Sequence, residues 1–109
     1  MKIDFNKIEE KVTENFKGGE GEMRANMFFD GTNRIMKALL VPGASIGMHC
    51  HETSSEIIYI LSGTGKAIYE GKEIALAAGD CHYCKKGFEH SLINCGTEAL
   101  VFFAVVPEH

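Results

Sequence analysis

The chain has 109 residues, 45% of them hydrophobic and 24% charged, with a formal net charge of −4 at pH 7. This length suits one domain with a single hydrophobic core, and the modest negative charge gives no field that would attract nucleic acid or an anionic membrane. Because the N-terminus lacks the apolar segment of a signal peptide and no apolar run approaches the roughly 18 residues of a membrane span, we expect a cytoplasmic protein.

The first predicted element is a short helix in an N-terminal arm, residues 1–20. Asn6 with a glutamate three residues later resembles a capping box, and Ile8, Val12 and Phe16 recur at helical spacing. Three glycines, at positions 18, 19 and 21, would then end the helix. The sequence therefore predicts a short helix within the arm.

The rest of the chain, residues 21–109, is expected to form one all-β barrel domain. Short apolar runs alternate there with turn residues such as Asp-Gly and Pro-Gly, which is typical of β-sandwiches and barrels. No helical segment separates the runs, so the sheets should be antiparallel. The predicted strands are 23–29, 34–41, 46–51, 56–61, 65–70, 73–76, 81–84, 89–94 and 99–106.

Two histidines, His49 and His51, lie one residue apart in the third predicted strand. Residues i and i+2 of a strand share a face and lie about 6.7 Å apart, so both imidazoles can reach one ion. Such a pair is a weak signal alone. An acidic residue, Glu56, follows closely and adds a third candidate ligand.

The spacing around this pair resembles the two sequence modules of the cupin superfamily. The first module is matched by Gly43, His49, His51, Glu56 and Gly63, and the second by Gly79, Gly87, His90 and Asn94. Lys85 stands where the family usually has proline, which affects only the expected shape of that loop. The resemblance implies a jelly-roll barrel with one metal ion, held by His49, His51, Glu56 and His90.

The ligand set also indicates which metals to expect. Three imidazoles and one carboxylate suit Mn, Fe, Co, Ni or Zn rather than Mg or Ca, which prefer oxygen ligands. Four protein ligands on a six-coordinate ion leave two positions for water, a substrate or dioxygen. The other two histidines, His82 and His109, are expected to have no part in the site.

The expected function is that of a metal-dependent enzyme acting on a small organic acid, with oxalate-decarboxylase-like or dioxygenase-like chemistry. Glu52 is the candidate acid or base near the metal. Arg24 and Arg34 are the only arginines, and either could bind a carboxylate substrate. The alternative is a non-catalytic module that binds a metal or small ligand, such as a sensor or a storage protein.

Two further expectations concern cysteines and assembly. Cys81 and Cys84 form a C-x-x-C pair, but an odd offset in a strand places them on opposite faces, so we expect reduced thiols without metal. The predicted strand 56–61 and the final apolar run are apolar on both faces, whereas a barrel has one interior. We therefore expect a homodimer that covers the second face.

Overall fold

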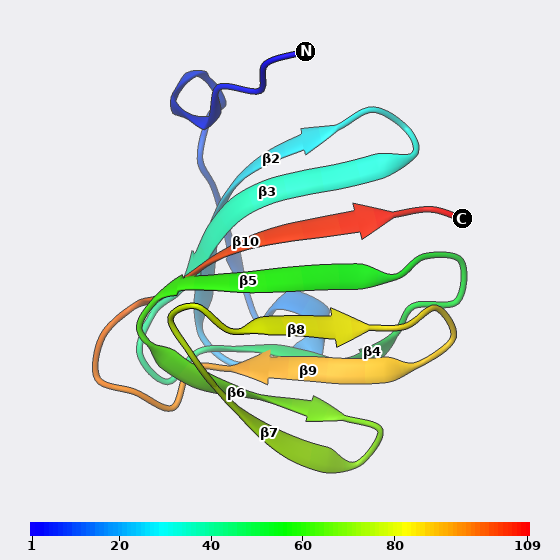
Figure 1. The fold of residues 1–109 in the computed structure, drawn as a ribbon. Coiled ribbons are helices and arrows are strands. Elements are labelled where there is room, and N and C mark those ends of the chain that lie inside the picture. The colour runs from blue at the N-terminus through cyan, green and yellow to red at the C-terminus, as the bar shows by residue number, and fades with distance from the viewer.

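The computed structural model describes residues 1–109 and consists almost entirely of antiparallel strands in two facing sheets (Figure 1). The larger sheet has the order β1 (Lys11–Glu14), β2 (Glu22–Phe29), β3 (Asn33–Leu40), β10 (Leu100–Pro107), β5 (Glu56–Ser62) and β8 (Cys81–Cys84). The smaller sheet has the order β4 (Ser45–Cys50), β9 (Glu89–Ile93), β6 (Thr64–Tyr69) and β7 (Lys72–Ala77). The prediction of an all-β antiparallel jelly roll is confirmed, and no helix has the length and apolar character needed to span a bilayer.

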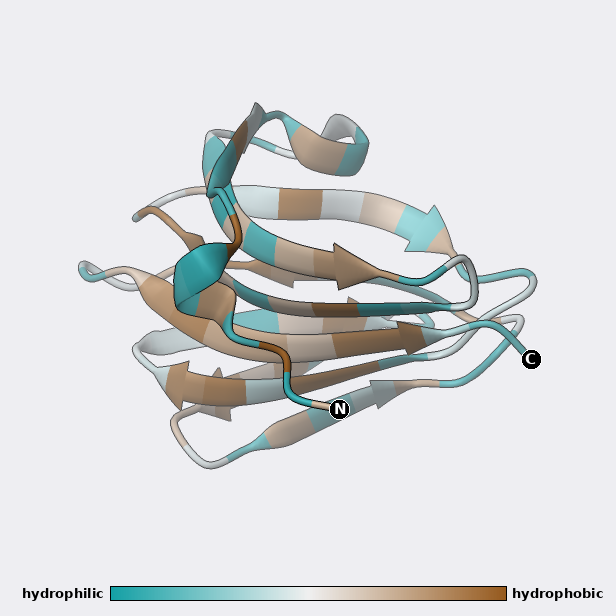
Figure 2. Ribbon diagram, turned by 90° about the horizontal axis from the view of Figure 1, so that it is seen from above, coloured by the Kyte–Doolittle hydropathy of each residue, from teal (hydrophilic) through white to brown (hydrophobic).

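The core lies between the two sheets because alternate residues of each strand point inward. In β5, Ile58 and Ile60 are fully buried, whereas Ile57 and Tyr59 on the other face are 39% and 43% exposed. Figure 2 shows the corresponding alternation of apolar and polar segments along the strands. Burial of one such isoleucine side chain stabilises the fold by about 1.5–3 kcal/mol, so these inward positions hold the two sheets together.

The helical part of the N-terminal arm is shorter than the spacing of Ile8, Val12 and Phe16 predicts. The structure instead has a 3₁₀ turn η1 (Phe5–Lys7), the edge strand β1 and a second turn η2 (Phe16–Gly18). Val12 pairs with Arg24 in the β1–β2 ladder, and Asp4 rather than Asn6 caps η1 by accepting a hydrogen bond from the Asn6 N–H at 3.1 Å. The open edge of the larger sheet supplies backbone hydrogen bonds that outweigh the local helical pattern.

The turn η2 lies directly against β4, which places the arm beside the barrel interior. A Cβ atom on Gly47 would collide with the Lys17 carbonyl oxygen and the Gly19 nitrogen, so the two backbones approach more closely than any other residue would allow. The Ser45 N–H also donates to the Glu20 carbonyl at 2.7 Å. These contacts fix Phe16 and Lys17 near the residues at the end of β4.

Candidate metal centre

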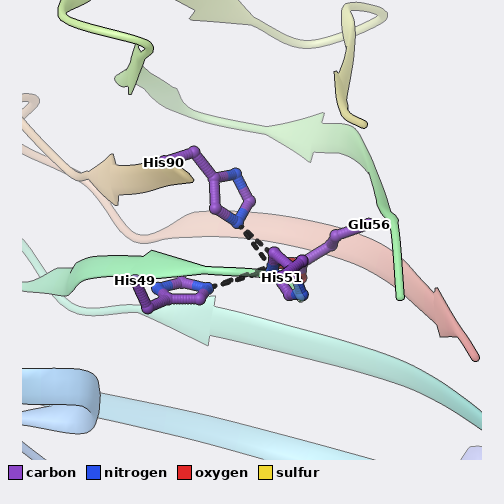
Figure 3. A group of neighbouring side chains, drawn as sticks. All are labelled: His49, His51, Glu56 and His90. Carbon is purple, nitrogen blue, oxygen red and sulfur yellow. Dashed lines mark hydrogen bonds and ion pairs between the residues drawn. The ribbon is translucent and has the colours of Figure 1, made fainter. Parts of the chain in front are cut away.

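Four side chains from three separate segments meet inside the barrel (Figure 3). His49 lies in β4, His51 follows that strand directly, Glu56 begins β5, and His90 lies in β9. His49 and His90 are register partners in the β4–β9 ladder, so antiparallel pairing brings together histidines that are far apart in the sequence. A register shift between Ile46 and His49 adjusts this part of the ladder.

The nitrogen atoms of the imidazoles and one carboxylate oxygen converge on a common centre. His51 Nε2 lies 3.1 Å from His49 Nε2 and 3.0 Å from His90 Nε2. Glu56 Oε1 lies 3.0 Å from His51 Nε2 and 2.9 Å from His90 Nε2. One ligand atom from each residue lies within 4.8 Å of all the others, so the cluster could hold a metal ion.

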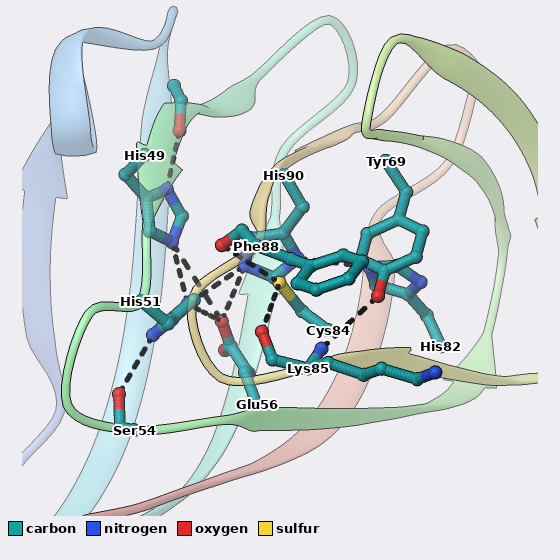
Figure 4. A network of polar contacts seen from close by, with 11 residues as sticks. His49, His51, Ser54, Glu56, Tyr69, His82, Cys84, Lys85, Phe88 and His90 are labelled. Atoms are coloured by element: carbon teal, nitrogen blue, oxygen red, sulfur yellow. Dashed lines mark hydrogen bonds and ion pairs between the residues drawn. The ribbon is translucent and has the colours of Figure 1, made fainter.

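The Nδ1 atoms point away from the centre, each toward a different partner (Figure 4). His49 Nδ1 lies 2.7 Å from the Gly47 carbonyl oxygen, which can only accept, so this nitrogen carries the proton and the Nε2 of the neutral ring is a lone pair. His51 Nδ1 lies 3.1 Å from the Ser54 hydroxyl. When the three rings are neutral and protonated on Nδ1, their Nε2 lone pairs repel the carboxylate, and a divalent cation at the centre would relieve that repulsion, so the donor set fits a transition metal.

Glu56 is a buried carboxylate, with 6% of its surface exposed. Burial opposes ionisation, but in the metal-free protein the imidazoles of His49, His51 and His90 outweigh it by donating hydrogen bonds whenever their Nε2 atoms are protonated, and they hold the pKa of Glu56 well below its usual range. The group is therefore anionic at neutral pH, which is the state that a metal ligand requires.

The cluster opens into a cavity of about 460 Å³. Of the residues proposed from the sequence, Glu52 and Arg34 line this cavity, and the Arg34 guanidinium lies 4.4 Å from the centre of the Phe29 ring. Arg24 does not line it: its exposed side chain forms an ion pair with Glu22 at 3.3 Å. The structure thus places one of the two arginines in the wall of the cavity into which the metal cluster opens.

Residues from the arm also line the cavity, which the sequence did not indicate. Phe16 and Lys17 form part of its wall because η2 packs on β4. No sequence signal could have placed them there, since the contact depends on the close approach of Gly19 to β4. Lys17 adds a second cation to the wall that carries Arg34.

His82 is a buried neighbour of the cluster that was expected to have no role. Its Nε2 lies 2.9 Å from the Nδ1 of His90, and the residue is 4% exposed. Burial, together with the nearby His90, lowers the pKa of His82 to about 4, so its imidazole is neutral at pH 7. The alternation of residues along a strand could have indicated that His82 is buried, because His82 and Cys84 lie on the same face of β8 and that face points inward.

The cysteines of the C-x-x-C pair lie on opposite faces of β8, as predicted. Cys81 is exposed and Cys84 is fully buried, and neither belongs to the metal cluster. Burial raises the pKa of the Cys84 thiol to about 12, and its sulfur contacts the carbonyl oxygen of Phe88 at 3.6 Å. Cys84 is therefore an inert packing residue.

A family model described as a cupin domain matches residues 36–106. The chain belongs to the cupin family. This cupin is 34% identical over 112 residues to a Thermotoga maritima protein named oxalate-binding protein, with 97% of this chain and 93% of the relative covered. It is also 25% identical over 100 residues to an uncharacterized protein of Methanocaldococcus jannaschii, with 92% of this chain and 80% of that one covered.

Solved structures share the fold of this chain. The crystal structure of a predicted oxalate decarboxylase from Thermotoga maritima matches this cupin with a TM-score of 0.92 and 32% identity, and both chains are covered completely. A cupin domain from Schizosaccharomyces pombe matches with a TM-score of 0.80 at 11% identity, covering 100% of this chain and 74% of the other. At that low identity the likeness supports the fold alone.

Proposed function

We propose that this cupin binds one divalent transition metal ion, Mn, Fe, Co, Ni or Zn, through His49, His51, Glu56 and His90. The observation that carries the proposal is the convergence of three imidazole Nε2 atoms and one carboxylate oxygen within 4.8 Å. A bound ion of this kind supplies Lewis acidity and, for Mn or Fe, redox chemistry. The protein residues hold the ligand atoms in place and keep the site inside the barrel.

The ligand that we propose for the open side of the site is a small organic acid such as oxalate. Arg34 and Lys17 line the cavity beside the metal cluster, and their positive charges suit a carboxylate dianion. The Phe29 ring under the Arg34 guanidinium restricts its motion, which reduces the entropy lost on binding. The names of the Thermotoga maritima matches, oxalate-binding protein and predicted oxalate decarboxylase, support the same ligand class.

Binding is tested by titrating oxalate into the Mn-loaded and metal-free protein in a calorimeter. The metal-loaded wild type should bind oxalate, and Arg34→Gln should weaken binding about 10-fold or more, because a charge-assisted hydrogen bond is lost. Arg24→Gln is the matched control, since Arg24 lies outside the cavity. Equal affinity of the metal-free and metal-loaded proteins would contradict the proposal.

Catalysis is a separate proposal that depends on Glu52, which is exposed and lines the cavity. Decarboxylation of monoprotonated oxalate breaks the carbon–carbon bond and gives carbon dioxide and formate, so a proton must reach the formate carbon. Glu52 is the side chain that we propose to carry it. Formate release by the Mn-loaded wild type that is lost in Glu52→Gln would support this role, and oxygen uptake would indicate the dioxygenase-like alternative.

The alternative function is non-catalytic binding of the same acid, as the name of the Thermotoga maritima oxalate-binding protein suggests. A binding module needs the metal and the cations but no proton carrier. Tight binding of oxalate by the wild type, with neither formate release nor oxygen uptake with any of the five metals, would establish this alternative.

We also propose that the protein is a homodimer. The outer face of β5 and β8 exposes four large apolar side chains: Ile57, Tyr59, Leu61 and Tyr83 are 39–50% exposed. Ile57 and Tyr83 are register partners, so the side chains lie side by side on one surface. A second copy of the chain would cover this apolar surface by a two-fold contact.

A further inference from the structure

We infer that His82 is a positioning residue, which fixes His90 in the tautomer that leaves its Nε2 free to bind the metal. The inference rests on the metal-binding part of the proposed function and goes beyond it, because it assigns a role to a histidine that is not a ligand. It stands on one contact, the 2.9 Å approach of His82 Nε2 to His90 Nδ1.

His90 needs such a partner more than the other two histidines do. His90 is 1% exposed, so water cannot satisfy its Nδ1, and the structure gives that atom no other hydrogen-bond partner than His82. Because a neutral imidazole carries one proton, binding a metal through Nε2 requires the proton on Nδ1. The Nδ1–H then donates to the lone pair of His82 Nε2.

The contact fixes the tautomers of both rings together. If His82 carried its own proton on Nε2, it would donate to His90 Nδ1, and the proton of His90 would have to sit on Nε2, where it blocks the metal. The Gly47 carbonyl beside His49 can only accept, and the Ser54 hydroxyl beside His51 can rotate. Of the three Nδ1 contacts, only the one between His82 and His90 has a partner that could donate in a fixed direction. The wrong tautomer of His82 would therefore prevent His90 from binding the metal.

The surrounding residues hold the His82 ring in this orientation (Figure 4). The ring of Tyr69 meets it edge to face, at 5.4 Å between ring centres and 81° between planes, and Tyr69 in turn stacks on Phe88 at 5.7 Å. Tyr69 is also the register partner of His90 in the β6–β9 ladder. His82 comes from β8 in the larger sheet and His90 from β9 in the smaller one, so the contact joins the two sheets at the metal cluster.

The test compares zinc affinity by chelator competition in four proteins: the wild type, His82→Leu, His82→Gln and His109→Leu. His82→Leu removes the acceptor and should weaken zinc binding about 10- to 100-fold, which is typical for loss of a hydrogen-bond partner of a ligand. His82→Gln keeps an oxygen that can accept from His90 Nδ1 and should restore most of the affinity. His109→Leu makes the same change at the one histidine outside the network and should leave the affinity unchanged.

A spectroscopic readout separates positioning from packing. In the zinc-loaded, ¹⁵N-histidine-labelled wild type, NMR should show His90 protonated at Nδ1 and His82 unprotonated at Nε2, with the same His90 tautomer in His82→Gln. A proton on His82 Nε2 would overturn the inference even if His82→Leu fails to fold. Equal zinc affinity of His82→Leu and the wild type, or equal loss of zinc affinity in both His82 variants, would overturn it as well.

Failure of the inference can be distinguished from failure of the proposed function. A wild type that binds no zinc, manganese or other divalent ion would refute the proposed function and this inference together. A wild type that binds zinc but not oxalate would refute only the proposed ligand.

Discussion

His90 is the most deeply buried of the three histidines in the cluster, with a side chain that is 1% exposed against 15% for His49 and 11% for His51. His90 also lies farthest from the cavity wall, since His49 and His51 line the cavity and His90 does not. A substitution at His90 therefore affects packing as well as metal binding. The same substitution at His49 affects a side chain next to open space.

This difference predicts distinct results for His49→Ala and His90→Ala. Both variants should retain only a small fraction of one metal ion per chain, because each loses one of four proposed ligands. His90→Ala should also destabilise the metal-free protein by about 2–4 kcal/mol, as expected when a buried ring is replaced by a cavity, whereas His49→Ala should have a smaller effect. Elemental analysis and urea unfolding measure the two quantities, and a fully metal-loaded double variant would rule out the site.

The thiols should differ in reactivity because of burial. Cys50, Cys81 and Cys95 are exposed, whereas the pKa of the buried Cys84 is raised to about 12. At about pH 8 almost no Cys84 is thiolate, so iodoacetamide should modify Cys50 and Cys95 in the native protein and all four cysteines after denaturation. Cys81 is the register partner of Tyr59 on the outer face, so the proposed dimer should protect it from labelling. Mass spectrometry counts the modified sites. Rapid labelling of Cys84 in the folded protein would show that the strand β8 opens readily.

The resemblance of the residue spacing to the two cupin modules nominated the four proposed ligands but not their surroundings. His49, His51 and Glu56 lie within eight residues of one another, so local geometry already relates them. The position of His82 behind His90 depends on how β8 and β9 pack across the two sheets, and the place of Lys17 depends on the arm. Contacts of that kind leave no periodic pattern in a single sequence.

At the scale of elements, the nine strands β2 to β10 lie within one residue of their predicted bounds. The agreement has a physical cause, because every break carries turn chemistry such as the Asp30-Gly31 pair between β2 and β3. The arm was predicted less well. Its strand β1 gains its hydrogen bonds from β2, and local spacing cannot show that such an edge is available.

The turn between β2 and β3 predicts a pH dependence of stability. Hydrogen bonds from the backbone N–H groups of Asn33 and Thr32 to the Asp30 carboxylate lower its pKa. A lowered pKa in the folded state adds stability above the unfolded value of 3.8 and loses it as the pH falls through the folded value. Asp30→Asn keeps the acceptor but not the charge, so the wild type should be more stable than this variant at about pH 6.

The two proteins should become equally stable at an acid pH well below the lowered pKa of Asp30, where its carboxyl is protonated in the folded state as well. Urea unfolding at both pH values measures the difference, and the remaining titrating groups are the same in the two proteins. A difference that persists unchanged in acid would show that the charge of Asp30 does not contribute.

At the scale of the whole molecule, the two faces of the larger sheet have different neighbours. The inner face packs on the smaller sheet, but the outer face exposes the apolar side chains of β5 and β8. Exposure of such an apolar surface to water is energetically unfavourable. This asymmetry is the physical basis of the proposed dimer.

Charged substitutions on that face should separate the dimer into folded monomers. Tyr59→Lys places a charge in the middle of the apolar surface, and Lys72→Ala, in a strand of the other sheet, is the control. Sedimentation should give about twice the chain mass of 12.0 kDa for the wild type and the control, and 12.0 kDa for Tyr59→Lys. A monomeric wild type at micromolar concentration would contradict the prediction.

The position of β10 has a consequence for biosynthesis. β10 is synthesised after the other nine strands, yet it lies in the middle of the larger sheet, between β3 and β5 (Figure 1). Until it is made, both of those strands present unpaired backbone edges that can pair with another nascent chain. The larger sheet can therefore be completed only after β10 has been synthesised, and until then its two open edges are exposed to other nascent chains.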